Sequence, residues 1–151
     1  MRAKRLLLIG GAAVMALAIV APALASTPGE RVTTIQLTFD VSTGNETFTS
    51  SGPGFCRSGL TVDANILYFE ADEEFKILMT KVFRCDDGSG DLAIELSAGE
   101  PLGSQTRSGG WIVTGGTGDY ATAVGGGTLS AKGRYPFDLV GADTMTGVIV
   151  R

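Results

Sequence analysis

Apolar and polar residues alternate one by one along residues 34–41. One face carries the apolar members Ile35, Leu37, Phe39 and Val41, and the other carries the polar members Thr34, Gln36, Thr38 and Asp40. This period of two is typical of a β-strand with one buried face. Residues 91–98 repeat the pattern, so they are expected to form a second strand of the same kind.

Six further segments have the length and composition of strands, and turn residues bound each of them. They are residues 46–50, 60–70, 75–85, 111–114, 127–133 and 144–150. Turns are expected at 42–45, 51–54, 72–74 and 86–90, and a polar loop over 99–110. About eight short strands, with hardly any helical periodicity, predict an all-β sandwich or barrel in a single domain.

The first 25 residues have the pattern of a secretory signal peptide. A basic head ends at Arg5, an apolar run follows, and Ala23 and Ala25 supply the small residues of a cleavage site. We expect cleavage between Ala25 and Ser26, export by the general secretory route, and a mature domain of residues 26–151 that is secreted or held at the envelope. The alternative is an uncleaved membrane anchor, because the apolar segment approaches the ~20 residues that span a bilayer.

Composition and charge exclude several kinds of chemistry and partner. The 151-residue chain has no histidine, which removes Ser-His-Asp triads, Cys-His dyads and histidine metal sites. Its net charge is −4, from 12 basic and 16 acidic residues. Cleavage removes Arg2, Lys4 and Arg5, which leaves nine basic residues against 16 acidic ones and a charge of −7. Nucleic acid and anionic membranes are disfavoured as partners, because both require a basic surface.

The two cysteines, Cys56 and Cys85, predict one disulfide, because an even pair in an exported chain normally forms one. The bond would join the loop before the third strand to the end of the fourth. Two buried free thiols are the alternative. A redox role is disfavoured because the chain has no C-x-x-C motif.

The glycine-rich segment over residues 112–118 resembles the turn that binds a dinucleotide pyrophosphate. That site requires a helix after the glycines. Only six residues separate Gly118 from the glycines at 125–127, which would stop a helix. No cofactor is therefore expected.

The same segment fits another pattern better. Gly115-Gly116-Thr117-Gly118-Asp119-Tyr120, followed by Gly125, is similar to the Gly-Gly-Thr-Gly-x-aromatic…Gly segment of the allene oxide cyclase and dirigent barrels. Small exported actinobacterial proteins with that barrel share further features with this chain, namely Cys56-Arg-Ser-Gly59, Phe83-Arg-Cys-Asp-Asp-Gly-Ser-Gly90 and Trp111. The resemblance covers roughly residues 32–133. It implies an eight-stranded antiparallel β-barrel with a central cavity.

The resemblance does not extend to an activity. The family pattern usually has an arginine before the last glycine of the motif, where this chain has Val124. The catalytic and pocket residues of the plant enzymes have no match here, so no catalytic residue is assigned. We expect Gly115, Gly116 and Gly118 to allow a positive φ or a close chain crossing at one barrel end, with Tyr120 packed as a plug.

The acidic clusters are interpreted as solvated turns, so no metal site is expected. A calcium-binding loop that starts at Asp86 would need a glutamate where Ser97 stands. The densest acidic patch falls in an expected turn and consists of Glu70, Asp72, Glu73 and Glu74.

We expect a non-catalytic module that binds or carries a small apolar molecule inside the barrel. The alternatives are a cyclase- or isomerase-type enzyme that acts in the cavity and a structural envelope protein without a ligand. Trp111, the single tryptophan, is expected in the core or, alternatively, stacked on a ligand at the barrel mouth. The sequence leaves a homo-oligomer open. Convergent ionisable groups of perturbed pKa in the cavity would favour the enzyme.

Overall fold

The computed structural model describes residues 31–40, 45–132 and 142–151. The predicted signal peptide and its cleavage site lie outside these residues. Within these ranges, eight strands follow one another, with one short 3-10 helix, η1, at Gly118–Tyr120. The strands are β1 (Thr33–Asp40), β2 (Asn45–Ser51), β3 (Ser58–Ala71), β4 (Glu74–Cys85), β5 (Asp91–Pro101), β6 (Thr106–Gly116), β7 (Val124–Lys132) and β8 (Ala142–Val150). In the part of the chain so described, no helix is long and apolar enough to cross a membrane.

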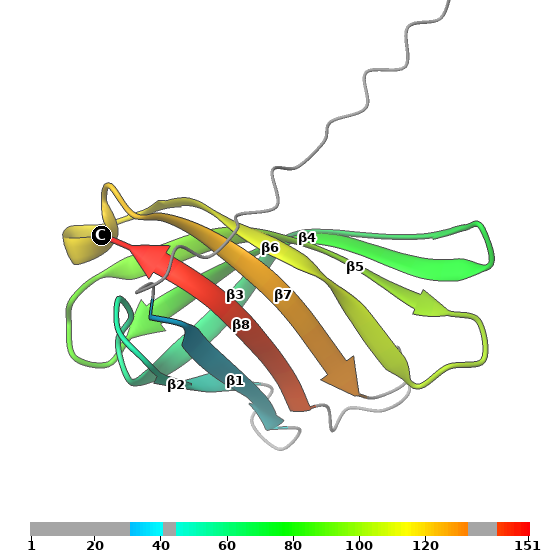
Figure 1. The fold of residues 1–151 in the computed structure, drawn as a ribbon, viewed down its shortest axis with the longest axis horizontal. Helices are drawn as coiled ribbons and strands as arrows, with labels where there is room; N and C mark the ends of the chain where they lie inside the picture. Colours follow the sequence, from blue (N-terminus) through cyan, green and yellow to red (C-terminus); the bar gives the residue numbers. More distant parts are fainter. Residues whose placement is uncertain (1–30, 41–44, 133–141) are drawn as a thin grey trace, which may run out of the picture.

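The strands form a closed antiparallel barrel, which confirms the predicted fold class. Each strand pairs with the next one along the chain, and β8 pairs with β1 over Thr33 to Thr38 (Figure 1). Every strand of the described barrel therefore has a neighbour on both sides, but β3 pairs with β2 only over Ser58 to Thr61. The rest of β3 has an unpaired edge on that side among the described residues, a feature that promotes association of sheets. The β3–β4 hairpin extends past the end of β2 toward the right of Figure 1, and β5 accompanies β4 along almost its whole length.

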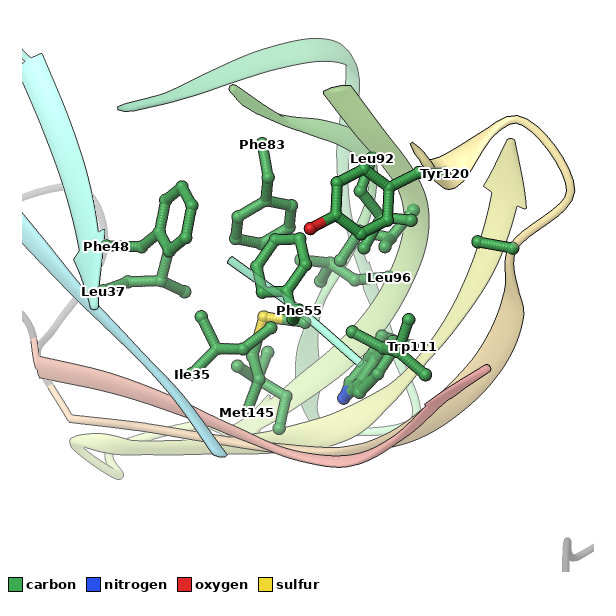
Figure 2. Packing of buried hydrophobic residues seen from close by; sticks show 14 of the residues in the cluster. Ile35, Leu37, Phe48, Phe55, Phe83, Leu92, Leu96, Trp111, Tyr120 and Met145 are labelled. Atoms are coloured by element: carbon green, nitrogen blue, oxygen red, sulfur yellow. The ribbon is translucent and has the colours of Figure 1, made fainter. Parts of the chain in front are cut away.

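One half of the barrel interior, here called the plug half, is filled by aromatic side chains. The rings of Phe48, Phe55, Phe83 and Tyr120 lie with centroids 5.2–5.6 Å apart, mostly edge to face (Figure 2). Tyr120 is fully buried, and its hydroxyl accepts a hydrogen bond of 2.9 Å from the Cys56 backbone N–H. Tyr120 is thus packed inside the barrel, in the position that the expected plug requires.

The predicted disulfide joins Cys56, in the loop before β3, to Cys85, the last residue of β4. The bond closes a loop between two residues that are 29 positions apart in the sequence. Replacing both cysteines by serine should lower the free energy of unfolding by about 3 kcal/mol, because the unfolded chain regains the entropy of the open loop. Urea denaturation of the variant and of reduced wild type checks this value. The two should agree, and a loss below about 1 kcal/mol in both would contradict the prediction.

The prediction of a polar loop over residues 99–110 is wrong. β5 continues to Pro101 and β6 begins at Thr106, so only residues 102–105 connect them. Glycine and serine suggested a loop, but here they allow two strands to approach closely. A Cβ added at Gly109 would lie 2.0 Å from the Ser97 carbonyl oxygen of β5. Small side chains are therefore required inside this strand pair.

Candidate functional site

The other half of the interior, here called the hairpin half, contains a cavity of about 160 Å³. It lies toward the β3–β4 and β5–β6 turns, next to the aromatic cluster. On the inward face of β4, Phe83 belongs to that cluster, and the preceding inward residues Lys81, Met79 and Ile77 line the cavity. Its apolar wall is formed by Leu37, Ile77, Met79, Leu96 and Leu129, together with the ring of Tyr68. Its charged wall is formed by Glu46, Asp63, Lys81, Arg107 and Asp143.

Lys81 is the centre of the charged wall. It is only 3% exposed, and its ammonium group donates hydrogen bonds to the carboxylates of Glu46 and Asp63. Strand register explains the cluster, because Asp63 lies opposite Lys81 in the β3–β4 pair and Glu46 lies opposite Thr61 in the β2–β3 pair. The Thr61 hydroxyl also donates to Glu46. The four side chains thus meet on one inward face.

The ion pairs decide the chemical state of Lys81. Burial alone would lower its pKa, but the negative charges of Glu46 and Asp63 together outweigh burial and raise the pKa above the ordinary 10.5. The side chain is therefore an ammonium at neutral pH. An amine nucleophile would need a lowered pKa, so Lys81 is not suited to form a Schiff base.

A second ion pair lies beside the cavity. Arg107 donates to Glu100 at 3.3 Å, and the side chains are 16% and 9% exposed. The two come from neighbouring strands, β6 and β5. Each charge therefore has a partner of opposite sign already in place.

Asp143 differs from the other carboxylates of the cavity. It lies opposite Leu37 of β1 and Ala131 of β7, and it forms no salt bridge with any described residue. Burial, reinforced by the negative charge of Glu46, raises the pKa of the Asp143 carboxyl, although Arg107 and Lys81 oppose the shift. Asp143 therefore keeps its proton to a higher pH than an ordinary aspartate.

A β-bulge places Tyr68 in the cavity. The β3–β4 register shifts between Ala64 and Leu67, where β3 has one extra residue, and Asn65 adopts a φ of +50°. The extra residue reverses the alternation, so Leu67 points outward and Tyr68 faces the cavity opposite Ile77. Bulges of this kind occur frequently beside functional sites, where they redirect a side chain.

The residues singled out from the sequence lie away from this cavity. Gly118 has a φ of +56°, and a Cβ at Gly116 would lie 2.5 Å from the Tyr120 carbonyl oxygen, so local geometry accounts for these two glycines. The Thr117 hydroxyl accepts a hydrogen bond of 2.9 Å from the Asp91 N–H. A Cβ at Gly125 would lie 2.1 Å from the Val148 carbonyl oxygen, whereas Gly115 has free space around it.

Trp111 is 3% exposed and packs in the buried cluster (Figure 2). Its indole N–H donates to the Thr128 carbonyl oxygen at 3.1 Å, and the residue is not part of the cavity lining. Core packing therefore accounts for its position, and stacking on a ligand stays an untested prediction.

The sequence analysis did not identify the charged wall. One signal was present, because Lys81 stands in phase with Ile77, Met79 and Phe83 on the inward face of β4. A charged residue in an apolar phase must meet partners of opposite charge in the interior.

Comparison with known proteins adds no identification. No protein-family model, curated protein or solved structure matches the chain. The similarity to allene oxide cyclase and dirigent barrels therefore stays a prediction from the motifs.

Proposed function

We propose that this protein is an exported, non-catalytic binding module that holds one small molecule in the hairpin half of its barrel. The cavity of about 160 Å³ is the observation that carries the proposal, because the plug half is filled by packed side chains. An apolar cavity of about 150 Å³ is large enough to bind benzene. The ligand should therefore have on the order of six to ten non-hydrogen atoms. The disulfide supports export, since such bonds persist in oxidising compartments.

The composition of the two walls refines the expected ligand. Leu37, Leu96 and Leu129 offer a surface for a hydrocarbon group, whose burial supplies about 25 cal/mol per Å². The charged wall offers orientation and specificity to a polar end. A wholly apolar ligand would make no polar contact with the charged wall. We therefore propose that the ligand is an amphiphilic molecule.

Native mass spectrometry of protein from the culture medium of its own host tests the proposal. Wild type should carry an additional mass on the order of 100 Da, the size of a benzene-like ligand. Leu129→Trp should lose this mass because the larger side chain fills the cavity. Leu78→Trp is the matched control, because Leu78 lies on the outer face of β4 and is 40% exposed. An unliganded wild type that also fails to bind small aromatic probes would favour the structural alternative.

A cyclase- or isomerase-type enzyme is the second candidate. It is favoured by the convergence of Asp143, whose raised pKa suits a proton donor, with Lys81 and Tyr68 around one cavity. Chromatography of the bound compound before and after incubation with fresh protein separates the two functions. A binding module returns the compound unchanged, whereas an isomerase yields a second compound of the same mass.

A further inference from the structure

We infer that the ligand carries a cationic ammonium group, which Asp143 binds inside the barrel. This inference rests on the proposed binding function and specifies its ligand class. It depends on the distribution of charge in the hairpin half and on the position of Asp143 in the cavity wall.

The interior of the hairpin half holds more negative than positive groups. Of the residues that the structure describes, four carboxyl groups face it or flank it, Glu46, Asp63, Glu100 and Asp143, against two cations, Lys81 and Arg107. Glu100 is balanced by Arg107, and Lys81 is shared between Glu46 and Asp63. Among the described residues, the charge of ionised Asp143 is left without a directly paired cation.

The surroundings of Asp143 explain why its charge should depend on whether a ligand occupies the cavity. Strands β1 and β7 place only Leu37 and Ala131 opposite it, while Glu46 and Asp63 add negative potential from β2 and β3. Lys81 and Arg107 lower that potential from β4 and β6 but are already engaged in ion pairs. Below its raised pKa, a proton neutralises the Asp143 carboxyl group in the cavity without a ligand. The raised pKa of its carboxyl group agrees with this state.

A ligand ammonium replaces that proton. The neutral carboxyl group loses H⁺ to the solvent, and the resulting carboxylate accepts hydrogen bonds from the ammonium, so the net charge of the site is unchanged. The hydrocarbon part of the ligand lies against the apolar wall. An anionic ligand has no equivalent partner, because both cations of the cavity already have carboxylates bound.

Calorimetric titration with benzylamine, benzyl alcohol and benzoate tests the inference on the intact mature domain. Benzylamine should bind at least about tenfold more tightly than benzyl alcohol, and benzoate most weakly. The affinity for benzylamine should rise with pH and level off above the raised pKa of Asp143, with proton release below that pKa. The sign follows because only the ionised carboxyl group attracts the ammonium.

Asp143→Asn should lower the affinity for benzylamine to that of benzyl alcohol and abolish its pH dependence. The variant is expected to fold, since the raised pKa means that the fold favours the neutral side chain. Glu95→Gln removes the same charge from the outer face of β5, where Glu95 is exposed, and should change neither property. The wild-type pH profile tests the inference even without the variant.

The possible results separate the inference from the function on which it rests. Equal binding of benzylamine and benzyl alcohol would leave the binding function standing and overturn the cationic ligand. Tighter binding of benzoate would overturn it in favour of an anion. Failure of all three probes to bind would overturn both the ligand class and the binding module.

Discussion

Lys81→Met is expected to lower the free energy of unfolding by about 3 kcal/mol at pH 7. The substitution leaves Glu46 and Asp63 side by side, without their cation, at a position where Lys81 was 3% exposed. Breaking a buried ion pair by removing one partner costs about 3–5 kcal/mol. The lower end applies here, because the Asp63 side chain is 35% exposed and water screens part of its charge. Urea denaturation provides the measurement.

The pH dependence of this loss has a definite sign. The folded-state pKa of Lys81 lies above its ordinary value of 10.5, so its stabilising contribution is fully present below that value. The contribution disappears only as the pH rises through the folded-state pKa. The difference between wild type and Lys81→Met should therefore be the same at pH 7 and pH 9.

Two control variants identify the cause of the loss. Lys76→Met removes a lysine of the same strand whose ion pairs with Asp72 and Glu74 are long and lie at the surface, 4.0 and 3.6 Å, and should cost less than about 1 kcal/mol. Adding Glu46→Gln and Asp63→Asn to Lys81→Met removes the unpaired charges and should restore most of the stability. A single Lys81→Met variant as stable as wild type would show that water reaches all three groups.

The fold could be predicted from the sequence because its determinants are local. Alternation over residues 34–41 and 91–98 fixes which side chains face inward, and turn residues at 86–90 fix where the chain reverses. The disulfide followed from an even cysteine count in a chain with a predicted export signal. The alternation and the turn signals each extend over a few residues, and neither they nor the cysteine count require knowledge of how the strands pair.

The candidate site could not be predicted because it depends on the register of strands that are distant in sequence. Glu46, Lys81 and Asp143 come from β2, β4 and β8, and only the closed barrel brings them to one cavity. The extra residue at the β3 bulge adds a second obstacle, because it reverses the phase of the alternation between Asp63 and Tyr68. No pattern of period two can be continued across such a residue.

Strand β3 also reverses the usual polarity of a barrel strand. Thr61 and Asp63 face the interior, whereas Leu60 and Val62 point outward and are 45% and 44% exposed. An assignment by hydrophobicity alone would place these four side chains on the wrong faces. The polar inward face is what makes the hairpin half a site for charged groups, and the apolar outward face is consistent with the homo-oligomer that the sequence leaves open.

Phe83→Ala is expected to lower the free energy of unfolding by about 4 kcal/mol. Phe83 is fully buried, and its ring contacts those of Phe48 and Phe55 at centroid distances of 5.2 and 5.6 Å, edge to face. Truncation removes these contacts and opens a cavity that the closed sheet cannot collapse to fill, and such substitutions cost about 3–5 kcal/mol. Thermal and urea denaturation measure the loss. Leu78→Ala on the outer face of the same strand is the control and should cost less than about 1 kcal/mol.

The same variant tests whether the two halves of the interior have separate roles. Phe83 belongs to the plug half and does not line the cavity, whereas Lys81, the next inward residue of β4, does. At a temperature where Phe83→Ala remains folded, its affinity for benzylamine should therefore stay within about twofold of wild type, because the substitution removes no group that lines the cavity. A larger fall would mean that the aromatic cluster and the charged cavity act as one unit. The plug half would then position the ligand as well as stabilise the fold.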